Sequence, residues 1–407
     1  MVIIFWDVQF SSFFRDYSAK FFSELNNMKA IYESLGVYIE AKSHKSLTEK
    51  EAQEIQQFEI EFDSLSPKPR YYADKNQSLF FRVVSIFERI SSYENSVVCM
   101  LRKLDDNTLV GVWINSTKRV WLNNQKGVLY FAYGARLYPE YRSKNVPEKI
   151  VELLYAESNR GVDVEKEFIF TSASNEIRNI ASTKMSLRTG YDIFAIRNAY
   201  LIHPSIFQFN QQDTLKQLPA SKYLSNNELK EYWETSFSNG LLINLNEILN
   251  HRNHLGSIYL ETGGSSINFT IWNMSYARLF KKSFHGSISQ RVDEHSYYLL
   301  YNFIAKGENS SQVLEKALFN LFGEERFKNS YFICHVWDVA ENKRAIEWLT
   351  NHSIGNNRLV FVGKPYVTDS VPKATVQFPF PFLDPRDCST SFAMDDSAYV
   401  YPNNSRL

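Results

Sequence analysis

The residues best suited to chemistry lie at 130–147, in the sequence YFAYGARLYPEYRSKNVP. An apolar, aromatic run there ends in a short basic turn, and a proline then starts a helix-like segment over 148–158. A strand that leads through such a turn into a helix aims free backbone N–H groups and the positive end of the helix dipole at one point. The pattern predicts a phosphate-binding turn. The residues assigned to it are Arg142, Ser143, Lys144, Asn145 and Val146.

A second candidate stretch, NIASTKMSLRTGY, covers 179–191. Together the two stretches resemble the GNAT superfamily of N-acetyltransferases. In that family a turn of the form R/Q-x-x-G-x-G/A grips the acetyl-CoA pyrophosphate, and the pattern N-x-A-S-x-x-L-Y-x-K-x-G-F packs along the cofactor. The second pattern is represented here by Asn179, Ala181, Ser182, Met185, Arg188, Gly190 and Tyr191.

The resemblance implies an α/β fold with a mixed central sheet and acetyl-CoA as co-substrate. In the family, a bulge separates the strand that corresponds to 130–137 here from its parallel neighbour. The backbone freed in this way polarises the thioester and pairs with pantetheine. Gly134 is the position in this run where backbone can approach a ligand closely. The implied cofactor contacts are Ala135, Arg136 and Leu137 through the backbone, with Asn179 and Ser182.

The chain departs from the family at three positions. Asn145 and Pro147 replace the glycines of the turn; asparagine tolerates the left-handed conformation and proline suits the first helical position, so the turn can still form, with weaker cofactor binding. Ser186 stands where the family has its proton-donating tyrosine. The proton donor to the leaving thiolate is then water or a phenol, either Tyr155 or Tyr191.

No general base is fixed by the sequence, since Glu33, Glu88 and Glu157 qualify by residue type alone. His251 and His254 have the spacing of two ligands on one helix face, but no third ligand follows, so we predict no metal site. Adjacent side chains alternate along a strand, which argues against a nucleophilic pair at Cys334 and His335.

Composition narrows the class of protein. The 407 residues are 44% hydrophobic, with 45 basic and 45 acidic side chains, so a large core is expected and no overall charge draws the molecule to nucleic acid or anionic membrane. Three scattered cysteines without disulfide spacing favour a reducing compartment, and the first ten residues do not resemble a signal sequence. A cytoplasmic protein without a membrane segment is predicted.

The order of elements predicts two units. We expect a GNAT domain over 1–204, with a helical insertion at about 43–70 that starts at a capping box from Ser46 to Glu49, and a divergent GNAT-like domain over 205–385. Helices are predicted over 11–35 and 175–188, and a pair of strands over 191–202. The strand and helix order of 130–200 recurs near the end of the chain, which suggests a duplication.

The segment from Leu383 to Asp387, LDPRD, is similar to the closing V-D-P-R-E-F of plant HOOKLESS-like proteins, within a two-domain branch that includes histidine N-acetyltransferase-like proteins. Residues 386–407 are predicted to be a tail.

Two functions remain open. The first is an acetyl-CoA-dependent N-acetyltransferase that acts on a small-molecule amine or an amino acid by direct attack in a ternary complex. The second is a catalytically degenerate relative that serves as a binding or scaffold subunit with a protein partner.

Overall fold

The structure is a computed structural model of the chain. It describes residues 28–65, 77–83, 86–122, 125–142, 146–158, 168–176, 183–184, 186–187, 191–204, 212–237, 242–274, 277–283, 288–290, 296–366, 382–388 and 391–392.

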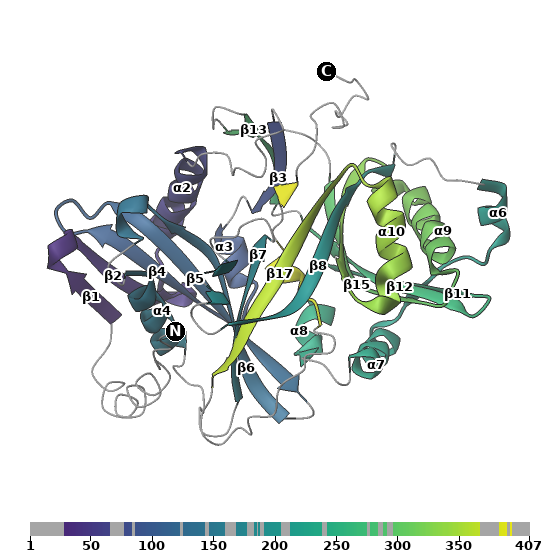
Figure 1. Ribbon diagram of the computed structural model, residues 1–407, viewed down its shortest axis with the longest axis horizontal. Helices are drawn as coiled ribbons and strands as arrows, with labels where there is room; N and C mark the ends of the chain where they lie inside the picture. The colour runs from purple at the N-terminus through teal and green to yellow at the C-terminus, as the bar shows by residue number, and fades with distance from the viewer. Residues whose placement is uncertain are drawn as a thin grey trace, which may run out of the picture.

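One mixed sheet runs through the molecule (Figure 1). The first half of the chain contributes β1 (Met28–Tyr32), β2 (Val37–Ser43), β4 (Asn95–Lys103), β5 (Leu109–Leu122), β6 (Gln125–Leu137), β7 (Phe168–Glu176) and β8 (Asp192–Ile202). The second half contributes β9 (Lys222–Leu224), β10 (Leu242–Ile243), β11 (His254–Thr262), β12 (Ser265–Asn273), β15 (Ser296–Lys306), β16 (Ser330–Trp337) and β17 (Gly355–Tyr366). The order is β1-β2-β4-β5-β6-β7-β17-β8-β16-β15-β12-β11-β9, and β10 pairs with β5.

Two neighbouring pairs of described strands are parallel, β6 with β7 and β15 with β16. Parallel neighbours need a crossover, and a helix supplies it in each case: α4 (Val146–Ser158) after β6 and α9 (Ser310–Gly323) after β15. The two halves therefore repeat one unit of antiparallel strands, a crossover helix and a parallel strand.

The two units exchange their final strands at the centre of the sheet. The last strand of the second half, β17, pairs with β7, and the last strand of the first half, β8, pairs with β16. The long β8 and β17 pair with each other and cross the middle of Figure 1. On each side of β8 and β17, the sheet continues with one parallel pair, β7 with β6 or β16 with β15, and then with antiparallel strands. The predicted fold class, a mixed α/β fold with helices packed on a central mixed sheet, is confirmed.

Helices cover the sheet on both faces. α4, α9 and α10 (Lys343–His352) pack on one face, here called the crossover face. The opposite face, here called the cluster face, carries α2 (Glu49–Leu65), α3 (Ile86–Ser91), α7 (Asn226–Ser236), α8 (Leu245–Leu249) and the segment 382–388. None of the described helices combines the length and the apolar character that a bilayer crossing requires.

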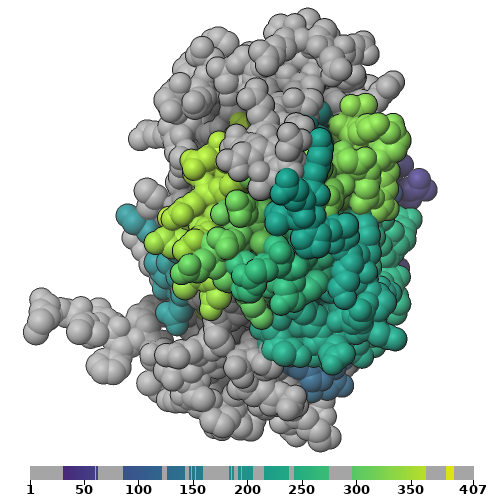
Figure 2. Space-filling view, turned by 90° about the vertical axis from the view of Figure 1, so that its right-hand side faces the viewer, coloured from purple at the N-terminus to yellow at the C-terminus, as the bar shows by residue number. Residues whose placement is uncertain are grey.

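A smaller sheet joins segments from distant parts of the chain, in the order β14 (Ile288–Gln290), β13 (Ala277–Ser283), β3 (Gln77–Val83) and β18 (Ser391–Phe392). Figure 2 views the end formed by the second half, where teal, green and yellow-green residues form one continuous surface.

Several local predictions were wrong. The helix predicted over 11–35 falls partly outside the described residues, and its described part contains β1, which pairs with β2. The capping box of α2 is formed by Thr48 and Glu51 rather than by Ser46 and Glu49: Thr48 Oγ1 accepts from the backbone of Glu51 at 3.2 Å, and the Glu51 carboxylate accepts from the backbone of Thr48 at 2.9 Å.

Two further differences concern strands. β7 continues to Glu176, into the region predicted as helix, and residues 191–202 form the single strand β8 instead of a pair. Both follow from pairing with β17, which pairs with β7 as far as Glu176 and with β8 from Asp192 to Leu201, and no local pattern signals that partner.

Candidate active site

The strands β6 and β7 separate part of the way along their length. Their parallel pairing runs from Gly127 opposite Phe168 to Ala132 opposite Ala173 and stops there. β6 continues to Leu137 against β5 alone, whereas β7 continues to Glu176 against β17. The two strands diverge, and the β6 edge that faces β7 has no described strand partner beyond Ala132. Such an edge can take an extended ligand as an added strand.

A bulge lies at the start of this separation. On β5, Ile114 pairs with Tyr133 and Val112 pairs with Arg136, so Gly134 and Ala135 both lie opposite one residue of β5. Gly134 has φ 64, a left-handed conformation that favours glycine. A Cβ at this position would lie 3.3 Å from Ile114 Cδ1. The predicted bulge is therefore present, and regular pairing with β5 resumes at Arg136.

The helix α4 starts close to the end of β6. It begins at Val146 with Pro147 as its second residue, slightly earlier than the predicted helix over 148–158 that the proline was expected to start. The Val146 side chain is fully buried among Ile150 and Leu154, so this residue can reach a ligand only through its backbone. The N-terminus of α4 is anchored by apolar packing.

Arg142 is exposed between β6 and α4. Its Nε donates to the carbonyl of Leu137 at 2.8 Å, and its guanidinium lies 6.0 Å from the centre of the Phe62 ring. The side chain thus lies across the end of β6. The other turn residues, Ser143, Lys144 and Asn145, and the downstream candidates Asn179 and Ser182, fall outside the described residues. Their roles stay predictions.

The three catalytic candidates come together on the crossover face. The hydroxyls of Tyr155 and Tyr191 lie 2.8 Å apart, and either of them can donate. Tyr155 projects from α4 and packs on Tyr130 of β6, with ring centres 5.6 Å apart. The Tyr191 backbone donates to the carbonyl of Ser186 at 3.1 Å. Two phenols 36 residues apart in the sequence are therefore neighbours on the crossover face, next to β6.

The second half carries an equivalent bulge, but its gap is filled. Thr270 pairs with Tyr301 and Asn268 with Ile304, and Asn302 has φ 53. Beyond the last parallel pair of β15 and β16, the buried side chain of Asn342 bridges the two strands. It accepts from the Ala305 backbone at 3.1 Å and donates to the carbonyls of Phe303 and Trp337 at 3.2 Å.

The turn before α9 is also closed. The Ser265 hydroxyl accepts from the backbone N–H of Asn309 at 3.0 Å, and Gly307, at φ 84, packs so tightly that a Cβ would lie 2.5 Å from the carbonyl of Gly264. Of the two related gaps, only the one between β6 and β7 has no described side chain bridging it.

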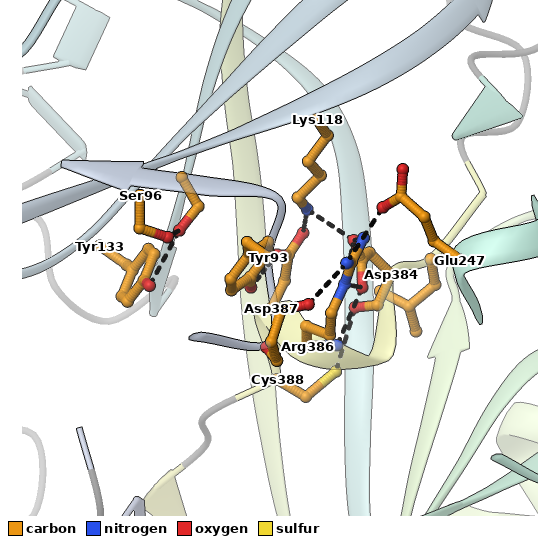
Figure 3. A network of polar contacts seen from close by, with 12 residues as sticks. Tyr93, Ser96, Lys118, Tyr133, Glu247, Asp384, Arg386, Asp387 and Cys388 are labelled. Carbon is orange, nitrogen blue, oxygen red and sulfur yellow. Dashed lines mark hydrogen bonds and ion pairs between the residues drawn. The ribbon is translucent and has the colours of Figure 1, made fainter. Parts of the chain in front are cut away.

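On the cluster face, buried charged residues link the two halves (Figure 3). Lys118 of β5 forms ion pairs with Asp384, at 3.0 Å, and with Asp387. Arg386 donates to both carboxylate oxygens of Asp384 and lies 3.3 Å from Glu247 of α8. Burial alone would raise the pKa of Asp384, but Arg386 and Lys118 hold that pKa well below its usual range.

The pKa of Asp387 is shifted in the opposite direction from the pKa of Asp384. Burial raises the pKa of Asp387 above its ordinary value, against the opposing effect of Lys118. Its Oδ1 also accepts from the Tyr93 hydroxyl at 2.8 Å. The sequence marked LDPRD as a motif but gave no indication of burial, because charged residues are mostly exposed. Arg386, Asp387 and Cys388, which the sequence assigned to a tail, are buried.

Other candidates have structural roles. His251 stacks on Trp272, with ring centres 4.6 Å apart, and the described residues hold no group of three or more His, Cys, Asp or Glu side chains placed for a metal. Cys334 packs among apolar residues of the crossover face, whereas His335 Nδ1 lies 3.1 Å from Cys388 Sγ on the cluster face. The predicted alternation of Cys334 and His335 is confirmed.

Comparison with known proteins gives structural likeness only. No protein-family model matches the chain, and no curated protein matches it in sequence. Saccharomyces cerevisiae N-myristoyltransferase with bound myristoyl-CoA is similar at 10% identity and TM-score 0.49, over 89% of this chain and 88% of that one. A protein of unknown function from Enterococcus faecalis, described as a probable N-acyltransferase, is similar at 13% identity and TM-score 0.38, over 80% and 72%. Because these similarities are weak, the fold is defined by the strand order of this chain and not by its likeness to these two structures.

Proposed function

We propose that the protein is an acyl-CoA-dependent N-acyltransferase that binds its thioester co-substrate between β6 and β7. The observation that carries this is the separation of the two strands at a bulge, directly before the helix α4. The backbone of Ala135, Arg136 and Leu137 would pair with the pantetheine arm as an added strand. The N–H groups that open α4, with Arg142, Ser143, Lys144 and Asn145, would hold the phosphates.

The reaction would be a direct transfer. A neutral amine attacks the thioester carbonyl, the carbon–sulfur bond breaks, the thiolate leaves with a proton from the enzyme, and the attacking nitrogen loses its extra proton to solvent. The hydroxyl pair of Tyr155 and Tyr191 supports this role, since one phenol can be reprotonated by the other. Ser186 lies beside the pair, and Asn179 and Ser182 complete the proposed cofactor contacts.

We propose acetyl-CoA as the co-substrate and a small amine or amino acid as the acceptor, in the cytoplasm, with the second half of the chain covering the acceptor side. The closed gap at Asn342 supports this division, because it leaves the second half free of any cofactor role. One cofactor site per chain follows.

Calorimetric titration of the full chain with acetyl-CoA tests the proposal, followed by release of free thiol across a panel of amines. We expect saturable binding at one site and amine-dependent thiol release. Absence of binding at millimolar acetyl-CoA, and also with longer acyl-CoA thioesters, would overturn the transferase proposal.

The second candidate is a scaffold subunit that has lost catalysis, and the substitutions at Asn145, Pro147 and Ser186 favour it. Binding of acetyl-CoA without thiol release for any amine would support this second function instead.

A further inference from the structure

Glu59 of α2 is a buried glutamate beside the bulge of β6. It is 7% exposed, and a Cβ added at Gly134 would lie 3.6 Å from Glu59 Oε1, so the carboxylate lies against the glycine of the bulge. A glutamate is seldom buried to this degree. The other glutamates of α2 are exposed or half-buried: Glu49, Glu51, Glu54 and Glu61. One acidic side chain of this helix is therefore placed where β6 and β7 begin to separate.

Aromatic packing holds α2 over the end of β6. Phe58 and Phe62 both pack on Tyr138, with ring centres 5.6 and 5.7 Å apart, and Tyr138 directly follows the last residue of β6. Both phenylalanines also belong to the same buried cluster as Ile114 of β5. Glu59 lies between them in the helix, so its position is fixed by a packed element and not by a loop.

The bulge itself can be reached from solvent. Ala135 is exposed and Gly134 is half-buried. Beyond Ala132, the edge of β6 that faces β7 has no strand partner among the described residues. Because Gly134 has no side chain, a ligand that pairs with this part of β6 can come close to the Glu59 carboxylate.

The direction of the proposed cofactor brings its reactive end to this bulge. The proposed phosphate site opens α4, which follows the end of β6 in the chain, so the pantetheine arm would run back along β6 from Leu137 toward Gly134. As far as Ala132, β6 is paired with β7 and has no edge left for an added strand. The thioester would therefore lie at Gly134, next to Glu59.

We propose that Glu59 is the general base of the acyl transfer, an inference that rests on the proposed function. The amine nitrogen attacks the thioester carbon, and as the carbon–sulfur bond breaks this nitrogen becomes that of a protonated amide, which is acidic enough for a carboxylate to deprotonate. Glu59 takes that proton and passes it to solvent, while the thiolate takes its own proton from Tyr155 or Tyr191. Glu59 lies on the cluster face and the two phenols lie on the crossover face, so the acceptor enters from the cluster face.

The three glutamates that qualify by residue type are placed less well. Glu33 lies in the turn between β1 and β2 at the edge of the sheet, and Glu88 is exposed on α3. Glu157 lies in the last turn of α4, which packs on Tyr130 where β6 and β7 are still paired. The sequence did not single out Glu59, because only the packing of α2 shows which of its glutamates reaches the bulge.

The test measures single-turnover thiol release from acetyl-CoA on the full chain, across a panel of amines, together with calorimetric binding of acetyl-CoA. Glu59→Gln, which keeps the size of the side chain, should lower the rate by about 10²–10⁴-fold and leave the Kd for acetyl-CoA and the melting temperature unchanged. The matched control is Glu61→Gln, which changes an exposed glutamate of the same helix and should keep the full rate. A full rate in Glu59→Gln would overturn the proposal.

Added formate separates a base from a structural residue. Glu59→Ala leaves a space in which formate can replace the missing carboxylate, so formate should raise the rate of this variant by about tenfold or more. The same formate should not raise the rate of Glu59→Gln, whose amide fills the space. A loss of rate that formate does not reverse, with weaker acetyl-CoA binding or a lower melting temperature, would show a structural glutamate. Absence of thiol release from the wild-type chain with every amine would instead reject the acyl transfer itself.

Discussion

Gly134 and Asn302 occupy the same place in the two halves of the chain, each as the residue with positive φ in a bulge that follows a tyrosine. After Gly134 the adjacent parallel strands separate and no described side chain bridges them. After Asn302 the side chain of Asn342 fills the equivalent position. The duplication therefore leaves two related frameworks with one open gap, which is why a single cofactor site is proposed.

The first prediction concerns Gly134. Because its φ is positive and a Cβ would press on Ile114, Gly134→Val should destabilise the fold by about 1–3 kcal/mol and weaken acetyl-CoA binding. Denaturant unfolding and calorimetry measure the two effects. Gly323→Ala at the end of α9 is the matched control, since nothing lies within 4 Å of its added Cβ. Unchanged affinity in a folded Gly134→Val protein would place the cofactor elsewhere.

The second prediction concerns the two phenols. If one of them protonates the thiolate, Tyr155→Phe or Tyr191→Phe should lower kcat by about 10²–10⁴-fold and leave the Kd for acetyl-CoA unchanged. Single-turnover thiol release and calorimetry separate these quantities. Tyr223→Phe, which removes an exposed hydroxyl bonded to Glu324 at 2.5 Å, provides the comparison. Full activity in both single variants and in the double variant would assign the proton to water.

The third prediction concerns Asn342. Replacement by leucine removes three hydrogen bonds to buried backbone groups and leaves those groups unsatisfied, so a loss of about 3 kcal/mol or more is expected in denaturant unfolding. Asn320→Leu, on α9, is the control, because that amide donates a single hydrogen bond among the described residues, to Ser221 Oγ at 3.1 Å. A loss no larger than in the control would mean that Asn342 does not hold the second gap closed.

Local patterns in the sequence predicted some of these features and not others. Gly134 inside an aromatic strand and Pro147 at a helix start act within a few residues, and both were predicted. The contact between Tyr155 and Tyr191 depends on how α4 packs on β6, so the residues were named but their contact was not. Lys118 and Asp387, which form an ion pair, lie 269 residues apart in the sequence, and only the tertiary fold brings them together. No local pattern carries that information.

The last prediction follows from the pKa of Asp384, which Arg386 and Lys118 hold below its ordinary value near 4 despite burial. A lowered pKa in the folded state means that Asp384 stabilises the protein above pH 4 and that this contribution is lost as the pH falls through the folded pKa. Burial raises the pKa of Asp387, so its contribution has the opposite sign: it is present at low pH and is lost as the pH rises through the folded pKa.

Denaturant unfolding between pH 3 and 7, the range on both sides of the ordinary carboxyl pKa, tests this difference. Asp384→Asn should be most destabilising at pH 7 and less so at pH 3, whereas the effect of Asp387→Asn should shrink as the pH rises. Glu234→Gln is the control, since Glu234 pairs with Lys230 at an exposed site where ion pairs contribute about 0–1 kcal/mol. Parallel pH profiles for the two aspartate variants would contradict the assignment, because both carboxylates contact Lys118 and only their remaining partners differ.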